Sequence, residues 1–192
     1  EAYLDDLAAH SRKRMDHPAH LRQIFERCRF YKIRLNPNKC VFAVTSGRLL
    51  GFIVSNEGIR VDPFKVEAIL RLPPPSSIRQ LQSLQGKSNF LRRFIVNYAE
   101  ITKGYMRLLK KGVPFLRDDY AQRSFDALKK ALTSAPLLSP PDYSRDFLLY
   151  LATAESTIGM VLVQEDDALI EHVIYYLSRG LVGPELRYTP IE

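Results

Sequence analysis

The sequence has few cysteines, no long apolar run and no internal repeat. Its 192 residues include only Cys28 and Cys40, which are too few for a disulfide framework and, without a clustered histidine, offer no zinc site. We therefore expect reduced, buried thiols. No stretch approaches the roughly 18 consecutive apolar residues that a transmembrane helix needs, so a membrane-spanning helix is excluded.

The first residues also lack a methionine and a basic, apolar leader. The chain begins Glu1-Ala2-Tyr3, which favours an N-terminus cut from a longer reading frame rather than a secretory signal. A hydrophobic content of 46% over 192 residues is enough to bury about 70% of the unfolded surface, in one large or two small domains. We expect a folded, soluble protein.

Positive charge is concentrated in one segment. The net charge is +7, and between positions 71 and 111 nine basic residues face the single acid Glu100, a balance of +8. Elsewhere acids and bases nearly cancel. A basic surplus gathered in this way favours a polyanionic partner. The nine residues are Arg71, Arg79, Lys87, Arg92, Arg93, Lys103, Arg107, Lys110 and Lys111.

Two adjacent carboxylates follow an aromatic and an aliphatic residue in Tyr3-Leu4-Asp5-Asp6. Mg²⁺ prefers oxygen ligands and usually takes one or two protein carboxylates. Neighbouring strand side chains point to opposite faces, so Asp5 and Asp6 can converge on one ion only at a bend, such as a hairpin tip. Such a pair is also common in solvated turns, and the tetrapeptide alone does not separate the two interpretations.

The first half of the chain reads as a helix followed by short strands. Asp16-His17-Pro18 predicts a helix start capped by Asp16, and the helix should end near Tyr31. Strands are expected at 33–35, 40–44 and 49–55, with a break at Gly47. Asp62-Pro63 predicts a further short helix, and Pro73-Pro74-Pro75 a stiff connector at a subdomain boundary.

The second half reads as helices and then strands. Ser77 and Gln80 form a capping box for an amphipathic helix reaching Ile95, whose apolar stripe packs inward while its basic residues remain available for phosphates. A helix is expected at about 118–132. Strands are then expected at 147–151, 158–164 and 172–177, so a second, mixed α/β domain is predicted.

Taken in this order, these motifs and expected helices and strands resemble the Pol polyprotein of gypsy-like LTR retrotransposons. The part that they resemble runs from the catalytic hairpin of reverse transcriptase to the start of the RNase H domain. The resemblance covers essentially the whole chain. It is carried by the Tyr-x-Asp-Asp motif at Tyr3–Asp6 and by the segments 20–26, 35–40, 50–55, 65–69, 84–95, 125–136, 158–164, 175–179 and 187–188.

This resemblance implies DNA synthesis by two-metal-ion catalysis, with Asp5 as a direct metal ligand and Asp6 as a weaker contributor. Lys39 would lie near the triphosphate, unless it is only a solvated turn lysine. The residues of the primer grip, Leu50, Gly51, Phe52, Ile53 and Val54, would hold the primer end, although Phe52 is equally compatible with plain core packing.

A thumb that follows an RNA–DNA hybrid needs phosphate contacts that do not read the bases. The candidates are Gln85, Gly86, Lys87, Arg92 and Arg93. Gly86 costs a helix about 1 kcal/mol relative to alanine, which indicates either the approach of a nucleic-acid backbone or a helix–helix contact. Three phosphate-binding cations would give a salt dependence with a log–log slope of about −2 to −3.

The chain departs from the family pattern at both metal sites. The family's additional palm aspartate and its fingers are absent from this sequence, so the isolated chain should bind Mg²⁺ poorly, should not polymerise, and should expose apolar surface and dissolve poorly. Ala152 stands where the family's first RNase H strand carries an aspartate, and the next catalytic glutamate would lie just beyond Glu192. We therefore assign no RNase H catalytic residue.

The expected fold class is α+β: truncated reverse transcriptase palm hairpins and a helical thumb, followed by the first strands of an RNase H-like mixed α/β domain. The expected regions are 1–72 palm with primer grip, 73–116 thumb, 117–144 connection and 145–192 RNase H-like. The parent is expected to be an RNA-directed DNA polymerase with two Mg²⁺ ions. The alternative is a non-catalytic binding remnant for primer–template.

The resemblance also implies the partners of the parent protein. They are an RNA template with a DNA primer or an RNA–DNA hybrid, dNTP and the rest of the Pol polyprotein, with no membrane partner. It places the parent inside the cell, in a cytoplasmic particle and in the nucleus.

Overall fold

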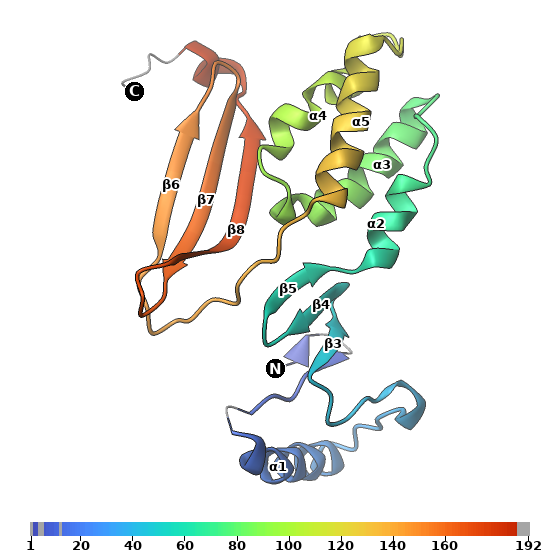
Figure 1. Ribbon diagram of the computed structural model, residues 1–192. Coiled ribbons are helices and arrows are strands. Elements are labelled where there is room, and N and C mark those ends of the chain that lie inside the picture. The colour runs from blue at the N-terminus through green and yellow to red at the C-terminus, as the bar shows by residue number, and fades with distance from the viewer. Residues whose placement is uncertain (1, 4–5, 12, 188–192) are drawn as a thin grey trace.

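The computed structural model describes residues 2–3, 6–11 and 13–187. Figure 1 shows a helical bundle with a three-stranded sheet beside it, and small hairpins and helix α1 at the other end of the molecule. The described strands form antiparallel pairs throughout. This mixture of helices and antiparallel sheets confirms the expected α+β class.

The N-terminal region is a short hairpin followed by helix α1. Strands β1 (Ala2–Tyr3) and β2 (Asp6–Leu7) pair Tyr3 with Asp6. A 3-10 turn, Arg14–Asp16, leads into α1, His17–Phe30, as the sequence predicted. The Asp16 side chain makes no capping hydrogen bond to the described backbone, so the expected cap is wrong, and Pro18 in the first turn remains as the start signal.

The segment after α1 contains a correction. Positions 33–35 and 40–44 are described and are not strands; between them lies only the 3-10 turn Pro37–Lys39. Val41, Phe42 and Val44 are exposed. Apolar runs predict burial but supply no pairing partner, and a strand persists only where a neighbour accepts its hydrogen bonds.

Strands β3 (Ser46–Leu49), β4 (Phe52–Ser55) and β5 (Gly58–Val61) form an antiparallel sheet. The single strand expected at 49–55 is instead divided by a two-residue turn, since Leu49 pairs with Phe52. Leu50 and Gly51 both have positive φ, 52° and 80°, as a type I′ hairpin turn requires. The expected break at Gly47 is also wrong, because Gly47 lies within β3.

Helix α2 (Pro63–Leu70) begins after Asp62, whose side chain accepts a hydrogen bond from Phe64 N at 3.0 Å. The connector of three prolines follows, outside any helix or strand. Ser77 then caps α3 (Ile78–Leu91) by accepting from Gln80 N, while the Gln80 side chain accepts from Ser76 N instead of closing the box on Ser77. The predicted N-caps Asp62 and Ser77 are therefore confirmed, whereas the reciprocal half of the predicted Ser77–Gln80 capping box is wrong.

The predicted helix reaching Ile95 ends earlier, at Leu91. A 3-10 turn, Arg92–Phe94, follows it, and Asn97 with φ of 54° turns the chain into α4 (Tyr98–Met106), a helix that the sequence did not predict. A 3-10 turn, Arg107–Leu109, ends this part. Helix α5 (Asp119–Thr133) confirms the helix expected at about 118–132 and is capped by Asp118.

Helices α2 to α5 share one hydrophobic core. Lys129 on α5 ties the bundle to the end of α2, because its Nζ donates to the carbonyl oxygens of Leu70 and Leu72 at 2.7 and 2.8 Å. Burial of the apolar side chains in this core stabilises the bundle by about 25 cal/mol per Å² of apolar surface removed from water. The fully or almost fully buried members include Ile69, Leu81, Leu84, Leu91, Phe94, Ile95, Leu128, Leu132 and Leu138.

The C-terminal sheet contains β6 (Leu148–Thr153), β7 (Thr157–Glu165) and β8 (Glu171–Gly180), in that order. The three strands expected there are confirmed. A 3-10 turn, Gly183–Arg187, follows β8. The pairing register passes from Leu162–Tyr175 to Val163–Val173, so Ile174 is an extra, bulged residue on β8.

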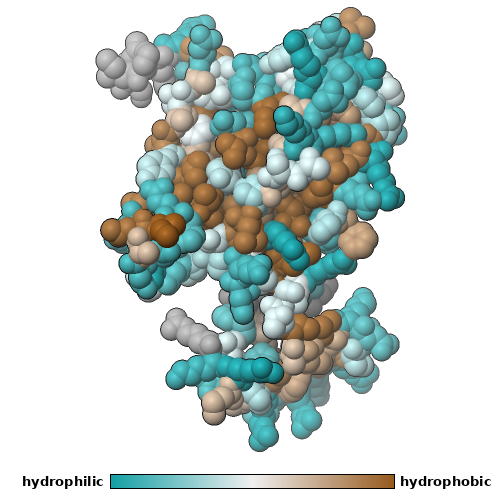
Figure 2. All heavy atoms as spheres, viewed as in Figure 1, coloured by the Kyte–Doolittle hydropathy of each residue, from teal (hydrophilic) through white to brown (hydrophobic). Residues whose placement is uncertain are grey.

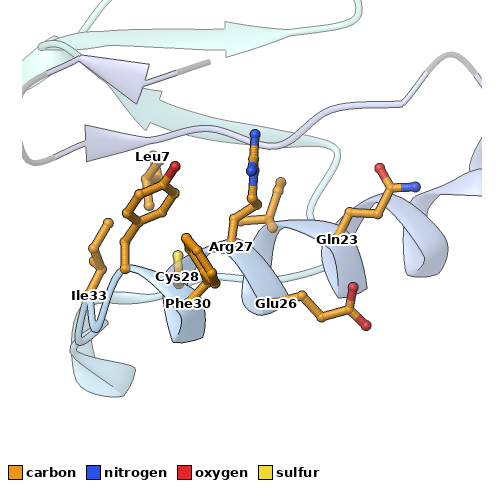
Figure 3. Close-up of a pocket in the computed structure, with 9 residues that line it drawn as sticks. Leu7, Gln23, Glu26, Arg27, Cys28, Phe30 and Ile33 are labelled. Carbon is orange, nitrogen blue, oxygen red and sulfur yellow. The ribbon is translucent and has the colours of Figure 1, made fainter.

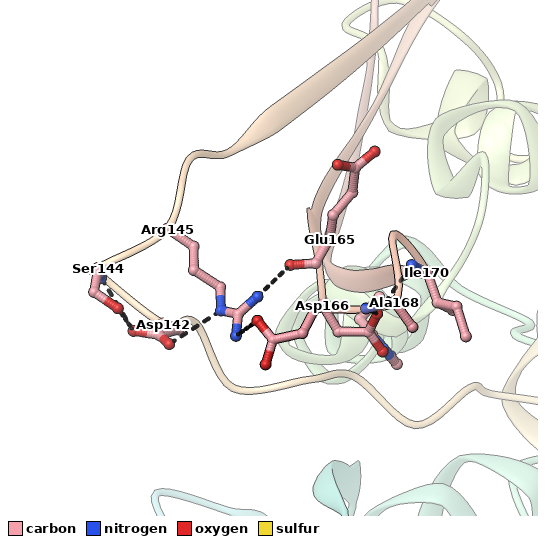
Figure 4. A network of polar contacts seen from close by, with 9 residues as sticks. Asp142, Ser144, Arg145, Glu165, Asp166, Ala168 and Ile170 are labelled. Atoms are coloured by element: carbon pink, nitrogen blue, oxygen red, sulfur yellow. Dashed lines mark hydrogen bonds and ion pairs between the residues drawn. The ribbon is translucent and has the colours of Figure 1, made fainter.

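A polar network fixes the turn between β7 and β8 (Figure 4). Arg145 donates to the Glu165 carbonyl at 3.1 Å and to Asp167 Oδ1 at 2.8 Å. Asp166 Oδ1 accepts from the backbone N–H groups of Ala168 and Ile170. The network connects this turn to the loop that precedes β6.

The Asp166 carboxylate should make the stability of this turn depend on pH. Its hydrogen bond with His172, supported by two backbone donors, lowers the pKa of Asp166 from 3.8 to about 2. The stabilisation is therefore complete above pH 4 and is lost as the pH falls through 2. In urea unfolding between pH 5 and 2, the stability difference between wild type and Asp166→Asn should shrink; a difference independent of pH would contradict this.

The surface is large for a chain of this mass. The accessible area is 14,539 Å², compared with about 9,300 Å² for a compact protein of 22.1 kDa. Phe30 and Val41 are 75% and 72% exposed, which confirms the expected apolar surface, while poor solubility stays a prediction. No helix in the described ranges has the length and apolar character to cross a bilayer.

Candidate nucleic-acid interface

The tip of the β3–β4 hairpin lies against helices α2 and α3. A Cβ atom at Gly51 would come within 2.6 Å of Lys65 Cε and 2.9 Å of Phe90 Cζ. The φ of 80° at this position also disfavours any side chain. Glycine therefore lets the turn approach the helices closely, and Leu50 beside it is 40% exposed.

Phe52 anchors the hairpin to the bundle. Its ring is parallel to that of Phe90, with centroids 4.8 Å apart, and lies 5.5 Å from the ring of Phe94. Phe52 is half-buried and packs against the bundle core, while Ile53 and Val54 are half-buried in β4. This placement favours the core-packing interpretation of Phe52, and both Phe52 and Gly51 lie against Phe90 of α3.

The outer face of α3 is open at Gly86. An added Cβ there would meet no atom within 4 Å in the described part of the chain, so these residues offer no helix–helix contact to explain the glycine. Lys87 is exposed and Gln85 half-exposed, while Leu84 and Ser88 point into the core. The face can therefore admit a ligand backbone.

The two arginines after α3 differ in their contacts. Arg92 is half-buried, and its Nη1 donates to Asn89 Oδ1 at 3.4 Å. Arg93 is half-buried, with its guanidinium carbon 5.5 Å from the Phe52 ring centroid and 4.6 Å from that of Tyr175. The helix thus presents Lys87 and Arg92 outward, whereas Arg93 lies between two rings of the protein.

The basic segment is partly neutralised by its neighbours. Arg71 pairs with Glu67, Lys103 with Glu100 and Arg107 with Asp118. Two of these partners, Glu67 and Asp118, lie outside positions 71–111, so counting charge along the sequence overstated the attraction for a polyanion. Sequence reasoning could not anticipate these pairs because folding brings the partners together.

Lys65 is a cation that sequence reasoning missed as part of this surface. Its Nζ lies 5.0 Å from the centroid of the Phe90 ring, beside the Leu50–Gly51 turn. Lys65 and Phe90 are 25 positions apart in the sequence, so no periodicity or motif could reveal their contact. The hairpin tip therefore lies beside a cation of α2.

The carboxylate pair is only partly within the described residues. Asp6 is exposed in β2 opposite Tyr3, and Leu4 and Asp5, which link the two strands, lie outside the described residues. A hairpin with a two-residue link is the bend that convergence requires, and its oxygen donors fit a hard cation. Among residues 2–3, 6–11 and 13–187, however, no three His, Cys, Asp or Glu side chains gather as a metal site.

Lys39 ends the 3-10 turn Pro37–Lys39 and is exposed. The turn is stabilised locally, because Asn36 Oδ1 accepts from Asn38 N at 3.0 Å. Lys39 thus has the surroundings of a solvated turn lysine. A role beside a triphosphate stays a hypothesis.

A groove separates β2 from α1 (Figure 3). Leu7 faces it from the hairpin, and Arg27, Phe30 and Ile33 face it from α1 and the residues that follow. Cys28 lines it as a buried free thiol, as expected, and Cys40 is a half-buried one. Most of the surface that lines the groove is apolar. Among the described residues, no cluster of acidic side chains lies beside Asp6.

In the C-terminal sheet, Ala152 lies on β6 opposite Gly159 of β7. It is exposed and carries no ligand atom. The described part of this sheet therefore has no carboxylate at the position where the family places one, and no nuclease site is assigned.

Two family models match the chain. Residues 1–54 match the family described as reverse transcriptase (RNA-dependent DNA polymerase), and residues 118–192 match the RNase H-like domain found in reverse transcriptase. Reverse transcriptases and RNases H generally use divalent metals. The two matches lie on either side of the basic α3 and α4.

Curated relatives align along almost the whole chain. The Pol polyproteins of the Drosophila melanogaster transposons opus and 412 are 32% and 33% identical over 99% of it. The Tf2-3 polyprotein of Schizosaccharomyces pombe is 25% identical over 97%. The chain spans 20%, 15% and 14% of these relatives' lengths, so it corresponds to a fifth or less of each.

Solved structures share the fold. A foamy viral protease–reverse transcriptase in complex with dsDNA covers 92% of the chain at a TM-score of 0.79 and 22% identity, with 37% of that protein matched. A second, in complex with RNA/DNA hybrid, covers 95% at 0.79 and 21% identity, with 25% matched. The homologues of this chain are therefore retrotransposon Pol polyproteins, consistent with the gypsy-like LTR group, and the chain joins a segment that matches reverse transcriptase to one that matches the RNase H-like domain.

Proposed function

We propose that this chain serves RNA-directed DNA synthesis in a Pol polyprotein, by holding primer–template on the surface that the tip of the β3–β4 hairpin forms with the outer face of α3. The observation that carries the proposal is the docking of the Leu50–Gly51 turn on Lys65 and Phe90. This contact joins the hairpin resembling a primer grip to a helix with an open, basic face. A primer end and the phosphates behind it could then be bound by one rigid surface.

The phosphate contacts in this proposal are Lys87 and Arg92, with the backbone at Gly86 and the Gln85 amide beside them. Phosphate contacts give affinity without reading bases, as a polymerase that moves along its template requires. The structural neighbours described as complexes with dsDNA and RNA/DNA hybrid support this kind of ligand. The template, the primer and dNTP are the proposed partners of the parent protein.

Asp5 and Asp6 are the proposed metal ligands in the parent protein. The family match over residues 1–54 and the hairpin bend support them. Mg²⁺ bound there would lower the pKa of the primer hydroxyl and neutralise charge on the triphosphate. Within this chain, the β1–β2 pairing places Asp6 opposite Tyr3 in a short two-stranded ribbon.

The phosphate contacts can be tested by the salt dependence of hybrid binding. If two cations displace counterions, the log of the binding constant should fall with the log of salt concentration at a slope of about −1.5 to −2. Lys87→Ala should reduce the magnitude of this slope by about 1. Fluorescence anisotropy of a labelled RNA–DNA hybrid at several salt concentrations measures both.

Lys130→Ala is the matched control, because Lys130 is an exposed lysine on α5, away from the α3 face. It should leave the slope unchanged. Equal slopes for wild type and Lys87→Ala would reject the α3 face as the phosphate-binding surface. Absence of hybrid binding by wild type would reject the proposed function.

The alternative function is non-catalytic binding of primer–template. It is favoured by Ala152 in place of a metal ligand on β6. Both functions predict the same hybrid binding, so only synthesis by the parent protein separates them.

A further inference from the structure

The point where the hairpin, the bundle and the C-terminal sheet meet is the turn Arg92–Phe94. Phe94 of this turn is buried and lies 5.5 Å from Phe52 of the hairpin. Arg93 lies between Phe52 and Tyr175 of β8. In Figure 1, β8 is the strand of its sheet next to the bundle, beside α4. Three regions far apart in sequence therefore converge on two neighbouring residues.

The surrounding contacts show how the sheet sits on the bundle. Ala99 N, in the first turn of α4, donates to Ser178 Oγ of β8 at 2.9 Å, and Lys103 Nζ donates to Ser156 Oγ at 2.6 Å. Figure 2 shows apolar residues gathered over the middle of the molecule. These contacts hold the sheet on α4. A backbone bridge joins the sheet to β5, because Leu138 pairs with Ile59 and Ser139 N donates to the Val173 carbonyl at 2.8 Å. The contacts of Arg93 reach the β3–β4 hairpin itself through Phe52.

We propose that Arg93 is a positioning residue that fixes the C-terminal sheet relative to the β3–β4 hairpin, and is not a phosphate contact. A guanidinium within about 6 Å of an aromatic ring is attracted to its face, and its planar group can stack on two rings at once. At 5.5 and 4.6 Å, Arg93 meets this condition with both Phe52 and Tyr175.

The bulge in β8 supports this role. Ile174 is the extra residue in the register, and it directly precedes Tyr175. Bulges redirect the side chains that follow them. The irregularity therefore lies where a tyrosine of an edge strand must reach across to the bundle, and the guanidinium of the half-buried Arg93 already contacts two rings of the protein.

A double-mutant cycle on the free chain tests the contact without any ligand. Arg93→Met and Tyr175→Leu, singly and together, are compared by urea unfolding. We expect a coupling of about two- to thirtyfold in the unfolding equilibrium constant, the range of a cation–π contact. Tyr175→Phe keeps the ring and should behave as wild type. A coupling factor near one would overturn the proposal.

A distance measurement tests positioning itself. Spin labels at exposed Glu57, in the β4–β5 turn, and at exposed Ala154, between β6 and β7, report the separation of the hairpin's sheet and the C-terminal sheet when the two native cysteines are replaced by serine. Arg93→Met should broaden the distance distribution, while Arg92→Met, in the same turn, should leave it unchanged. Equal distributions in both variants would overturn the proposal. If Arg93→Met does not fold, Tyr175→Leu against Tyr175→Phe gives the same comparison.

The salt slope of hybrid binding separates the two roles of Arg93. A positioning residue leaves the slope unchanged on Arg93→Met, whereas a phosphate contact would reduce its magnitude by about 1. A reduced slope would overturn the proposal. If the wild-type chain does not bind a hybrid, the proposed function fails, while the mutant cycle and the distances still decide the role of Arg93.

Discussion

Replacing Asp5 by asparagine in a Pol protein that carries this segment should lower primer extension on a poly(rA) template by roughly a thousandfold. Loss of a direct carboxylate ligand removes several kcal/mol of charge stabilisation in the transition state, and each 1.36 kcal/mol is tenfold in rate. Extension of an oligo(dT) primer with Mg²⁺ measures the effect. Hybrid affinity should remain unchanged, because the proposed phosphate contacts lie on α3.

Asp16→Asn is a suitable control for this experiment. It makes the same chemical change on an exposed aspartate outside the hairpin, one whose side chain makes no capping bond in the described structure. It should extend primers as wild type does. Equal extension by Asp5→Asn and wild type would remove Asp5 from the metal site and leave the non-catalytic binding function as the better account of the chain.

Replacing Leu128 by alanine should destabilise the chain by about 2–5 kcal/mol. Leu128 has no exposed surface and lies in the middle of α5, within the core shared by α2 to α5. Removing its branched end leaves a cavity that the close-packed helices cannot fill. The melting temperature, followed by circular dichroism, should fall by roughly 5–20 °C.

Leu116→Ala removes the same atoms from a residue that is 70% exposed. It should change the free energy of unfolding by less than about 0.5 kcal/mol. A similar loss in both variants would mean that the bundle is not the stabilising unit of the chain. The comparison also tests whether α5 folds together with α2, α3 and α4.

The sequence predicted elements best where a local signal was complete. Asp62, Ser77 and Asp118 each precede a helix and each accept a hydrogen bond from its first turn. The three C-terminal strands were found because apolar, β-branched runs alternate with polar turns. These signals act over a few residues and need no knowledge of the rest of the fold.

Predictions failed where the outcome depended on tertiary contacts. Leu50 and Gly51 read as the middle of a strand, because leucine rarely adopts positive φ and its apolar neighbours continue the run. Helix α4 was missed because its start, Asn97, has a left-handed conformation and no capping hydrogen bond. The candidate phosphate residues formed one run in sequence, but the fold turns Arg93 inward, between rings from β4 and β8.

The tight fit at Gly51 has a mechanical consequence for the proposed binding of primer–template. Because Phe52 stacks on Phe90 and the glycine turn fits closely beside that ring, we expect a movement of α3 to carry the tip with it. In the proposed function, the primer end and the phosphates behind it would then move together. The chain would bend at residues 40–45, which pair with no strand in the described structure.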